Sequence, residues 1–203
     1  MASSASWLIA VLFATTFPVA CAERPEIVVS VNSYSKISRT GNTYVLKPMA
    51  GVDGNSMEFA EFASNVEKTF ASMGLSRVVD ESSASVTIFA SYGMDSAEKS
   101  YSYEVETGRS KTLVYTPQGV AAANTSTYGT ETGRYTEFRR WIQFRAFDAE
   151  QIRHNQLFEV WKTDIVSSGS SSDMRLVLPL MLNAARAHIM TNTGRSITLS
   201  MAY

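Results

Sequence analysis

The segment between "TYVLKP" and "SVTIFASY" places the strongest constraint on the fold. The two flanking sequences, at 43–48 and 85–92, have the residue pattern of β-strands. Between them, aromatic and aliphatic residues recur at helical spacing from Phe59 to Met73. A strand–helix–strand unit of this length predicts a right-handed crossover that joins parallel strands. The chain should therefore contain a sheet with a helix packed on it.

The ends of this helix carry their own signals. Asn55 stands three residues before Glu58, which predicts an N-cap and a capping box. Gly74 is placed to end the helix in a left-handed conformation. The apolar stripe between these ends is typical of a core-facing helix, and we interpret it as core rather than as a ligand site.

The second half of the chain predicts a hairpin and another helix. Two strand patterns, within 135–149 and 156–169, alternate apolar and polar residues and should pair as an antiparallel hairpin at 135–166. Serines and Asp173 then offer caps for a second helix, in which Pro179 should introduce a kink. A strand at 26–37 and a last strand at the C-terminus complete the pattern.

Residues 107–134 differ from the rest of the chain. They are rich in Thr, Ser, Gly and Ala and have almost no period. A structureless connection of this length is uncommon in a compact domain. We interpret it as a flexible insertion, either a mobile hairpin or flap or a tolerated surface loop. Residues 23–203 otherwise predict one α+β domain, a mixed sheet of about six to seven strands with two helices on one face.

The first 22 residues predict export. They contain no Lys, Arg, Asp or Glu, and within them "WLIAVLFATTF" is an apolar run of about a dozen residues. This run is too short for a permanent membrane span, which needs roughly 20 residues, but it suits a signal peptide. The n-region lacks its usual Lys or Arg, so either the free amino terminus suffices or translation starts upstream.

Cys21 is the only cysteine, and the sequence "PVACAE" (18–23) leaves two fates open for it. Cleavage after Ala22 would remove it with the leader. Cleavage before Cys21, as in a bacterial lipobox, would let its thiol carry a lipid. We expect lipidation, and in both cases no reactive thiol remains in an oxidising compartment.

The sequence does not carry a recognisable catalytic or cofactor motif. The net charge of −1 does not suggest a nucleic-acid partner. "SSGSSSD" (167–173) lacks the second glycine of a nucleophile elbow, and the only histidines, His154 and His188, have no carboxylate in a motif with them. We therefore expect no cofactor, no metal and no enzymatic activity. An anion held near Arg175 at the start of the second helix is a minor alternative.

Three segments resemble one bacterial envelope family. They are "YVLKP…FAEFASNVEKTFASMGLSRVVDESSASVTIFASYG", "RWIQFRAFDAE" and "VWKTDIVSSGSSSDMRLVLPLMLNAARAHI". Together they are similar to the family called domain of unknown function 4136, over roughly residues 26–200. Many members of that family are predicted lipoproteins, so the resemblance implies an envelope location and a lipid at Cys21. The family has no established activity, and no site residue follows from it.

The expected function is a non-enzymatic envelope protein that binds or scaffolds an unknown envelope protein or glycan. Its candidate binding surface consists of Tyr101, Tyr103, Arg139, Trp141 and Arg145, near the flexible segment 107–134. The alternative is a soluble periplasmic module that binds a small ligand in a pocket beneath that segment. The predicted location is the outer membrane, as a lipoprotein, or the free periplasm.

Overall fold

The computed structural model describes residues 26–36, 41–117 and 119–202. These residues form one seven-stranded mixed sheet and three α-helices, which confirms the predicted α+β fold. The strand order is β3-β2-β4-β5-β6-β1-β7. The strands are β1 (Glu26–Ser35), β2 (Thr43–Pro48), β3 (Ser76–Arg77), β4 (Val86–Thr116), β5 (Gly119–Asp148), β6 (Glu159–Gly169) and β7 (Ile197–Ala202).

The predicted parallel crossover is present. Strand β2 pairs with β4 in parallel, and helix α1 (Met57–Ser72) lies between them in the chain. Across the sheet, in the order β4-β5-β6-β1-β7, all neighbouring strands pair antiparallel. Strands β5 and β6 form the predicted hairpin. Helix α2 (Ala149–Arg153) is a short turn between β5 and β6, and α3 (Met174–Ala185) follows β6.

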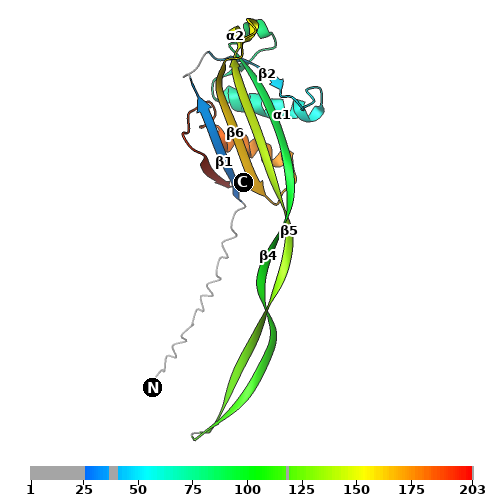
Figure 1. Cartoon of the computed structure of the whole chain (residues 1–203), viewed down its shortest axis with the longest axis vertical. Helices are drawn as coiled ribbons and strands as arrows, with labels where there is room; N and C mark the ends of the chain where they lie inside the picture. The colour runs from blue at the N-terminus through cyan, green and yellow to red at the C-terminus, as the bar shows by residue number, and fades with distance from the viewer. Residues whose placement is uncertain (1–25, 37–40, 118, 203) are drawn as a thin grey trace, which may run out of the picture.

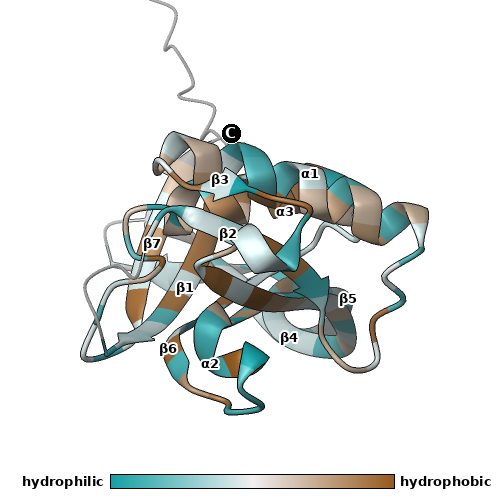
Figure 2. Ribbon diagram, turned by 90° about the horizontal axis from the view of Figure 1, so that it is seen from above, coloured by the Kyte–Doolittle hydropathy of each residue, from teal (hydrophilic) through white to brown (hydrophobic). Residues whose placement is uncertain are grey.

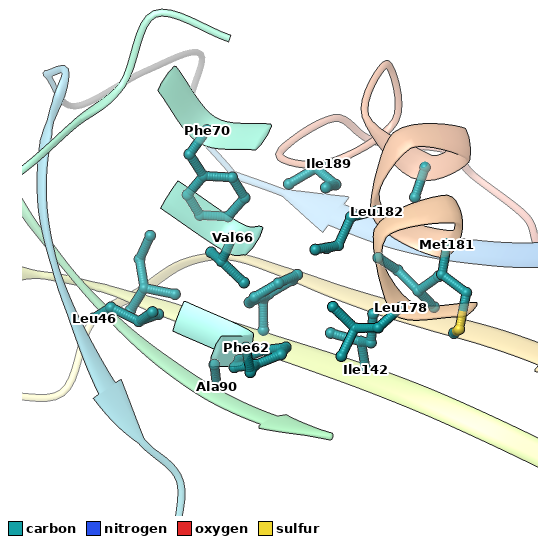
Figure 3. Close-up of a cluster of buried hydrophobic side chains, with 14 of the residues drawn as sticks. Leu46, Phe62, Val66, Phe70, Ala90, Ile142, Leu178, Met181, Leu182 and Ile189 are labelled. Atoms are coloured by element: carbon teal, nitrogen blue, oxygen red, sulfur yellow. The ribbon is translucent and has the colours of Figure 1, made fainter. Parts of the chain in front are cut away.

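Helices α1 and α3 lie on the same face of the sheet (Figure 2). The core fills the layer between them and the strands, and Phe62, Val66 and Phe70 of α1 point into it (Figure 3). Met181 and Leu182 of α3 are fully buried there as well. The helical spacing predicted this buried stripe because only one side of each helix is removed from water.

The predicted N-cap of α1 is wrong by one residue. The cap is Ser56, whose Oγ accepts a hydrogen bond from the N–H of Phe59 at 3.0 Å. The backbone N–H of Asn55 instead donates to Oδ1 of Asp53 at 2.9 Å. Both residue types suit an N-cap, and the turn formed with Asp53 decides between them.

Strands β4 and β5 continue far beyond the sheet (Figure 1). They contain 31 and 30 residues and stay paired from Val86 opposite Asp148 to Thr116 opposite Gly119. Pairing of β2 with β4 ends at Ala90, and pairing of β6 with β5 ends at Phe138. The outer part, residues 97–137, is a two-stranded twisted ribbon that we call the arm. At about 3.3 Å per residue, its twenty or so residues per strand extend roughly 65 Å.

The segment 107–134 is therefore a paired hairpin, which was one of the two expectations drawn from its composition, and not a surface loop. Apart from residue 118, which lies outside the described residues, it belongs to the paired strands of the arm and its turn. The apolar alternation that reveals a strand arises when one face is buried, and most side chains of this segment are exposed. Its flexibility stays a prediction. Within the described ranges, no helix has the length and apolar character to cross a membrane.

Candidate interaction surface

The five predicted surface residues lie on one side of the β4–β5 ladder, the side away from the helices. Arg145 is opposite Phe89, Trp141 is opposite Gly93, and Arg139 is opposite Asp95. Tyr101 and Tyr103 follow on the same side, opposite Gly133 and Glu131. They share a side because they are separated by even numbers of residues along each strand.

These residues nevertheless form two separate groups. The strand pairs that hold Arg139 and Tyr101, the nearest members of the two groups, are six residues apart, or roughly 20 Å, and those that hold Arg145 and Tyr103 are about 14 residues apart, or roughly 45 Å. The ribbon also twists strongly between them (Figure 1). The first group, Arg139, Trp141 and Arg145, lies on the open face of the sheet. The second group, Tyr101 and Tyr103, lies on the arm.

Two residues of the sheet group hold neighbouring strands together. The guanidinium of Arg145 forms an ion pair with Glu159 of β6 at 3.2 Å. The indole of Trp141 lies on β4 at Gly93, where an added Cβ would come within 2.5 Å of the ring atom Cζ2. Only glycine permits this contact, so Trp141 has a structural role. The ion pair with Glu159 gives Arg145 a structural role as well. Arg139 is exposed.

The arm group is larger than predicted and includes Tyr135. The ring centroid of Tyr101 lies 5.7 Å from that of Tyr103 and 6.1 Å from that of Tyr135. All three tyrosines are exposed, by 53%, 42% and 45%. The hydroxyl of Tyr103 donates to Oε2 of Glu131 at 3.0 Å, and this hydrogen bond raises the pKa of the phenol. Tyr135 could have been found by extending the alternation back from Arg139.

Ion pairs within the arm join its two strands. Lys99 pairs with Glu137 across the ladder, and Arg134 lies 3.7 Å from Glu98. Further out, Glu106 accepts hydrogen bonds from Arg109 of its own strand and from Ser126 of the other. The hydrogen bond from Arg109, the larger cause, lowers the pKa of the Glu106 carboxyl. The charged part of the arm thus suits contact with water.

Arg140 is a buried cation that was not predicted as a site residue. It is only 2% exposed and lies on the helix-covered face of β5. Its Nη2 and Nε donate to the carbonyl oxygen of Ser171, at 2.6 and 3.1 Å. Arg140 therefore binds the loop before α3 to the sheet. Alternation places it on the same side as Ile142, and this was the signal available in the sequence.

The serines of this loop lack a neighbouring histidine. Oγ of Ser171 accepts the backbone N–H of Asp173 at 3.2 Å, and Asp173 in turn caps α3. His188 follows the far end of α3, about 18 Å away along a helix of this length. His154 follows α2, at the end of the sheet opposite to this loop. Neither histidine is therefore placed to act as a general base for these serines.

The predicted anion site at the start of α3 is occupied by protein groups. Oδ1 of Asp173 accepts the N–H groups of Arg175 and Leu176. The side chain of Arg175 pairs with Glu61 of α1 at 3.1 Å. Within the described ranges, His, Cys, Asp and Glu side chains form no cluster of three that could hold a metal ion.

A cleft of about 390 Å³ lies beside the ends of β1 and β6. Lys36 and Lys162 line it, together with Tyr34 and the buried Trp161. The ammonium of Lys162 lies 4.8 Å from the ring centroid of Tyr34. Residues 107–134 do not line this cleft, and the arm points away from the sheet rather than over it (Figure 1).

Comparisons with known proteins leave the family open. No family model and no curated protein matches the chain. Among solved structures, it is similar to a PDZ domain protein from Parabacteroides distasonis, with 12% identity and a TM-score of 0.42. The match covers 87% of this chain and 39% of the other, so the chain spans about two fifths of that protein's length. A likeness at this level does not establish a shared fold, and the resemblance to domain of unknown function 4136 stays a prediction.

Proposed function

We propose that this chain is a non-enzymatic, exported protein of the cell envelope that binds another envelope protein through its arm. One observation carries the proposal: the arm is a long ribbon whose edges do not pair with any other described strand, and it exposes a cluster of tyrosines. An isolated two-stranded ribbon is marginally stable in water. A projection of this length is therefore most simply explained by a partner that covers it.

The chemistry of the arm favours a protein over a glycan. Unpaired strand edges offer rows of N–H and C=O groups that can pair with a strand of another chain. Tyrosine is also enriched in protein interfaces, because its ring adds contact area and its hydroxyl a hydrogen bond. Tyr101, Tyr103 and Tyr135 provide both on one side of the ribbon.

The proposed location rests on the leader and on Cys21, which lie outside the described residues. The described part adds one geometric consequence of a lipid at Cys21. Val28 of β1 pairs with Ser168, which pairs with Arg139 near the base of the arm. Strand β1 therefore begins at the end of the sheet from which the arm leaves. Five residues from Cys21 to Glu26 span at most about 17 Å, so a lipid there would hold the base of the arm near a membrane.

Site-specific crosslinking tests the proposed partner contact. A photoreactive phenylalanine analogue at position 103 should crosslink to a distinct envelope protein, and the same analogue at Tyr34 on the sheet should not. The variant Tyr101→Ala/Tyr103→Ala should capture that protein at least tenfold less. If the double variant and the wild type capture the same proteins equally, the arm is not the binding surface.

The absence of enzymatic activity is a separate proposal. A fluorophosphonate probe should label neither Ser170 nor Ser171. Labelling of the wild type that disappears in Ser170→Ala or Ser171→Ala would show that the loop before α3 is a nucleophile after all.

A small-ligand module is the second candidate function, and the 390 Å³ cleft now supports it in place of a pocket under the arm. Its volume lies in the range of small-molecule sites, and its two lysines favour an anionic ligand. Such a ligand should raise the melting temperature of the wild type and not that of Lys162→Met. A screen of anionic envelope metabolites without any shift would remove this candidate.

A further inference from the structure

The end of the arm differs in chemistry from the rest of it. We call residues 112–117 and 119–123 the tip, and they contain no Asp, Glu, Lys or Arg. Leu113, Tyr115 and Val120 are 54%, 78% and 59% exposed. Large apolar side chains that stay more than half exposed on a projecting turn call for a partner.

The register arranges the tip and the residues behind it in a fixed order on one side of the ribbon. Tyr115 is opposite Val120, and Leu113 is opposite Ala122. Two residues further from the end, on the same side, Lys111 is opposite Asn124. Arg109 follows after two more residues. One side of the arm thus presents apolar groups at its end and cations directly behind them.

The charge of this region has one sign. Residues 107–130 contain two basic residues, Arg109 and Lys111, and no acidic residue, although the whole chain has a net charge of −1. Lys111 does not form an ion pair with any residue that the structure describes. Arg109 is held by Glu106 at 2.9 Å and so is partly neutralised. The outer arm therefore complements a surface that is apolar inside and anionic outside.

We propose that the tip contacts the surface of an anionic lipid bilayer. Leu113, Tyr115 and Val120 enter the interfacial layer, and Lys111 reaches the lipid phosphates. The spacing fits, because Lys111 lies two residues or about 7 Å behind Leu113, and interfacial elements are buried about 5–10 Å. Tyrosine is a preferred residue at this depth. The phosphates attract the flanking cations.

The contact is shallow rather than membrane-spanning. The edges of the ribbon carry unpaired N–H and C=O groups, which hydrocarbon does not tolerate. The charged residues that begin at Lys111 also stop deeper entry. The proposal goes beyond the protein partner proposed above, since it concerns other residues and another chemical class. A projecting, charge-free end with cations directly behind it favours a lipid surface, which is apolar inside and anionic outside, over a groove on a protein.

An environment-sensitive fluorophore on the tip tests this contact. In the full chain with Cys21→Ser, the substitution Val120→Cys gives a single labelling site. With vesicles of phosphatidylglycerol and phosphatidylethanolamine, the label should shift to shorter wavelength and be quenched by a spin label near the lipid headgroup. The matched control is Leu157→Cys, which is 78% exposed and precedes β6 at the opposite end of the sheet. Its label should not change.

The two labels also distinguish vesicle binding through the tip from vesicle binding through the leader. Attachment through the leader alone would leave the label at position 120 in water. Lys111→Gln should reduce the affinity for the anionic vesicles several-fold and leave binding to phosphatidylcholine unchanged. The proposal is overturned if the label at 120 does not respond to vesicles or responds no more than the label at 157. It is also overturned if that label shifts without lipid as the protein concentration rises, which would indicate a second copy as the occupant.

Discussion

The body and the arm contain the same two strands, held by different forces. In the body, β4 and β5 are central strands with helices on one face, and Ile88, Ile142 and Phe144 are almost completely buried. In the arm, the same strands have only each other. Exposed tyrosines and cross-strand ion pairs replace the core there. The comparison teaches that apolar burial stabilises the body, and that the arm depends on the body for its own stability.

The largest effect should come from truncating the core of the body. Phe70 is fully buried and its ring lies near those of Tyr44, Phe144 and Trp161. Phe70→Ala should lower the free energy of unfolding by about 3–5 kcal/mol, because it leaves a cavity among rings that cannot close it. Urea unfolding measures this. Tyr101→Ala in the arm is the matched aromatic control and should shift the midpoint far less; equal losses would contradict the comparison.

The next largest loss of stability should come from a substitution of Gly93 in β4, compared with a substitution of Gly108 in the same strand. Gly93→Ala should cost about 1–3 kcal/mol, since its Cβ would lie 2.5 Å from Cζ2 of the Trp141 indole, which is itself half-buried. Gly108→Ala in the arm is the control. Its Cβ would lie 4.0 Å from Cβ of Thr127, an ordinary contact, so thermal unfolding should barely change. If both alanines are equally harmless, Trp141 is more mobile than its contact with Gly93 implies.

Tyr44 offers a gain in stability within the body. Its hydroxyl is buried and has no hydrogen-bond partner, a cost that Tyr44→Phe removes. We expect the variant to be about 1 kcal/mol more stable near neutral pH, as measured by urea unfolding. A loss of stability in Tyr44→Phe would mean that the hydroxyl is satisfied in solution.

The same residue predicts a dependence on alkaline pH. Burial, and secondly the carboxylate of Glu67, raise the pKa of Tyr44 to about 12. The unfolded chain loses this proton near pH 10, so the folded state binds more protons between pH 10 and 12 and its stability falls over that range. The wild type should lose about 2–3 kcal/mol more than Tyr44→Phe across it. Parallel pH curves for the two proteins would assign the loss to other tyrosines.

The smallest effect concerns the ion pairs of the arm. Lys99→Gln breaks the pair with Glu137, and we expect no measurable change in the urea midpoint, because exposed ion pairs contribute little. Hydrogen exchange of the arm amides should nevertheless be faster than in the wild type, while β5–β6 amides keep their protection. Unchanged exchange in the arm would indicate that backbone pairing alone holds it.

The sequence determined the body of this protein to a large degree. The apolar stripe from Phe59 to Met73 and the alternating pattern at 135–166 exist because one side of each element is buried. Burial imposes a period, and a period can be read from residue order. This period predicted the crossover, both long helices and the mixed sheet. It also contained the signal for Arg140, which shares a side with Ile142 despite its charge.

Only the tertiary structure decided the arm and the candidate surface. In the outer part of the arm, at 107–116 and 119–134, most side chains on both faces are exposed, so no period marks the strands and their register follows from cross-strand pairing. The choice of Ser56 over Asn55 as the helix cap depended on a local turn. The separation of Tyr101 from Trp141 depended on the length and twist of the ribbon, and the contact of Trp141 with Gly93 on a register. Apart from the helix cap, contacts between strands set these features, and residue order alone does not specify such contacts where burial imposes no pattern.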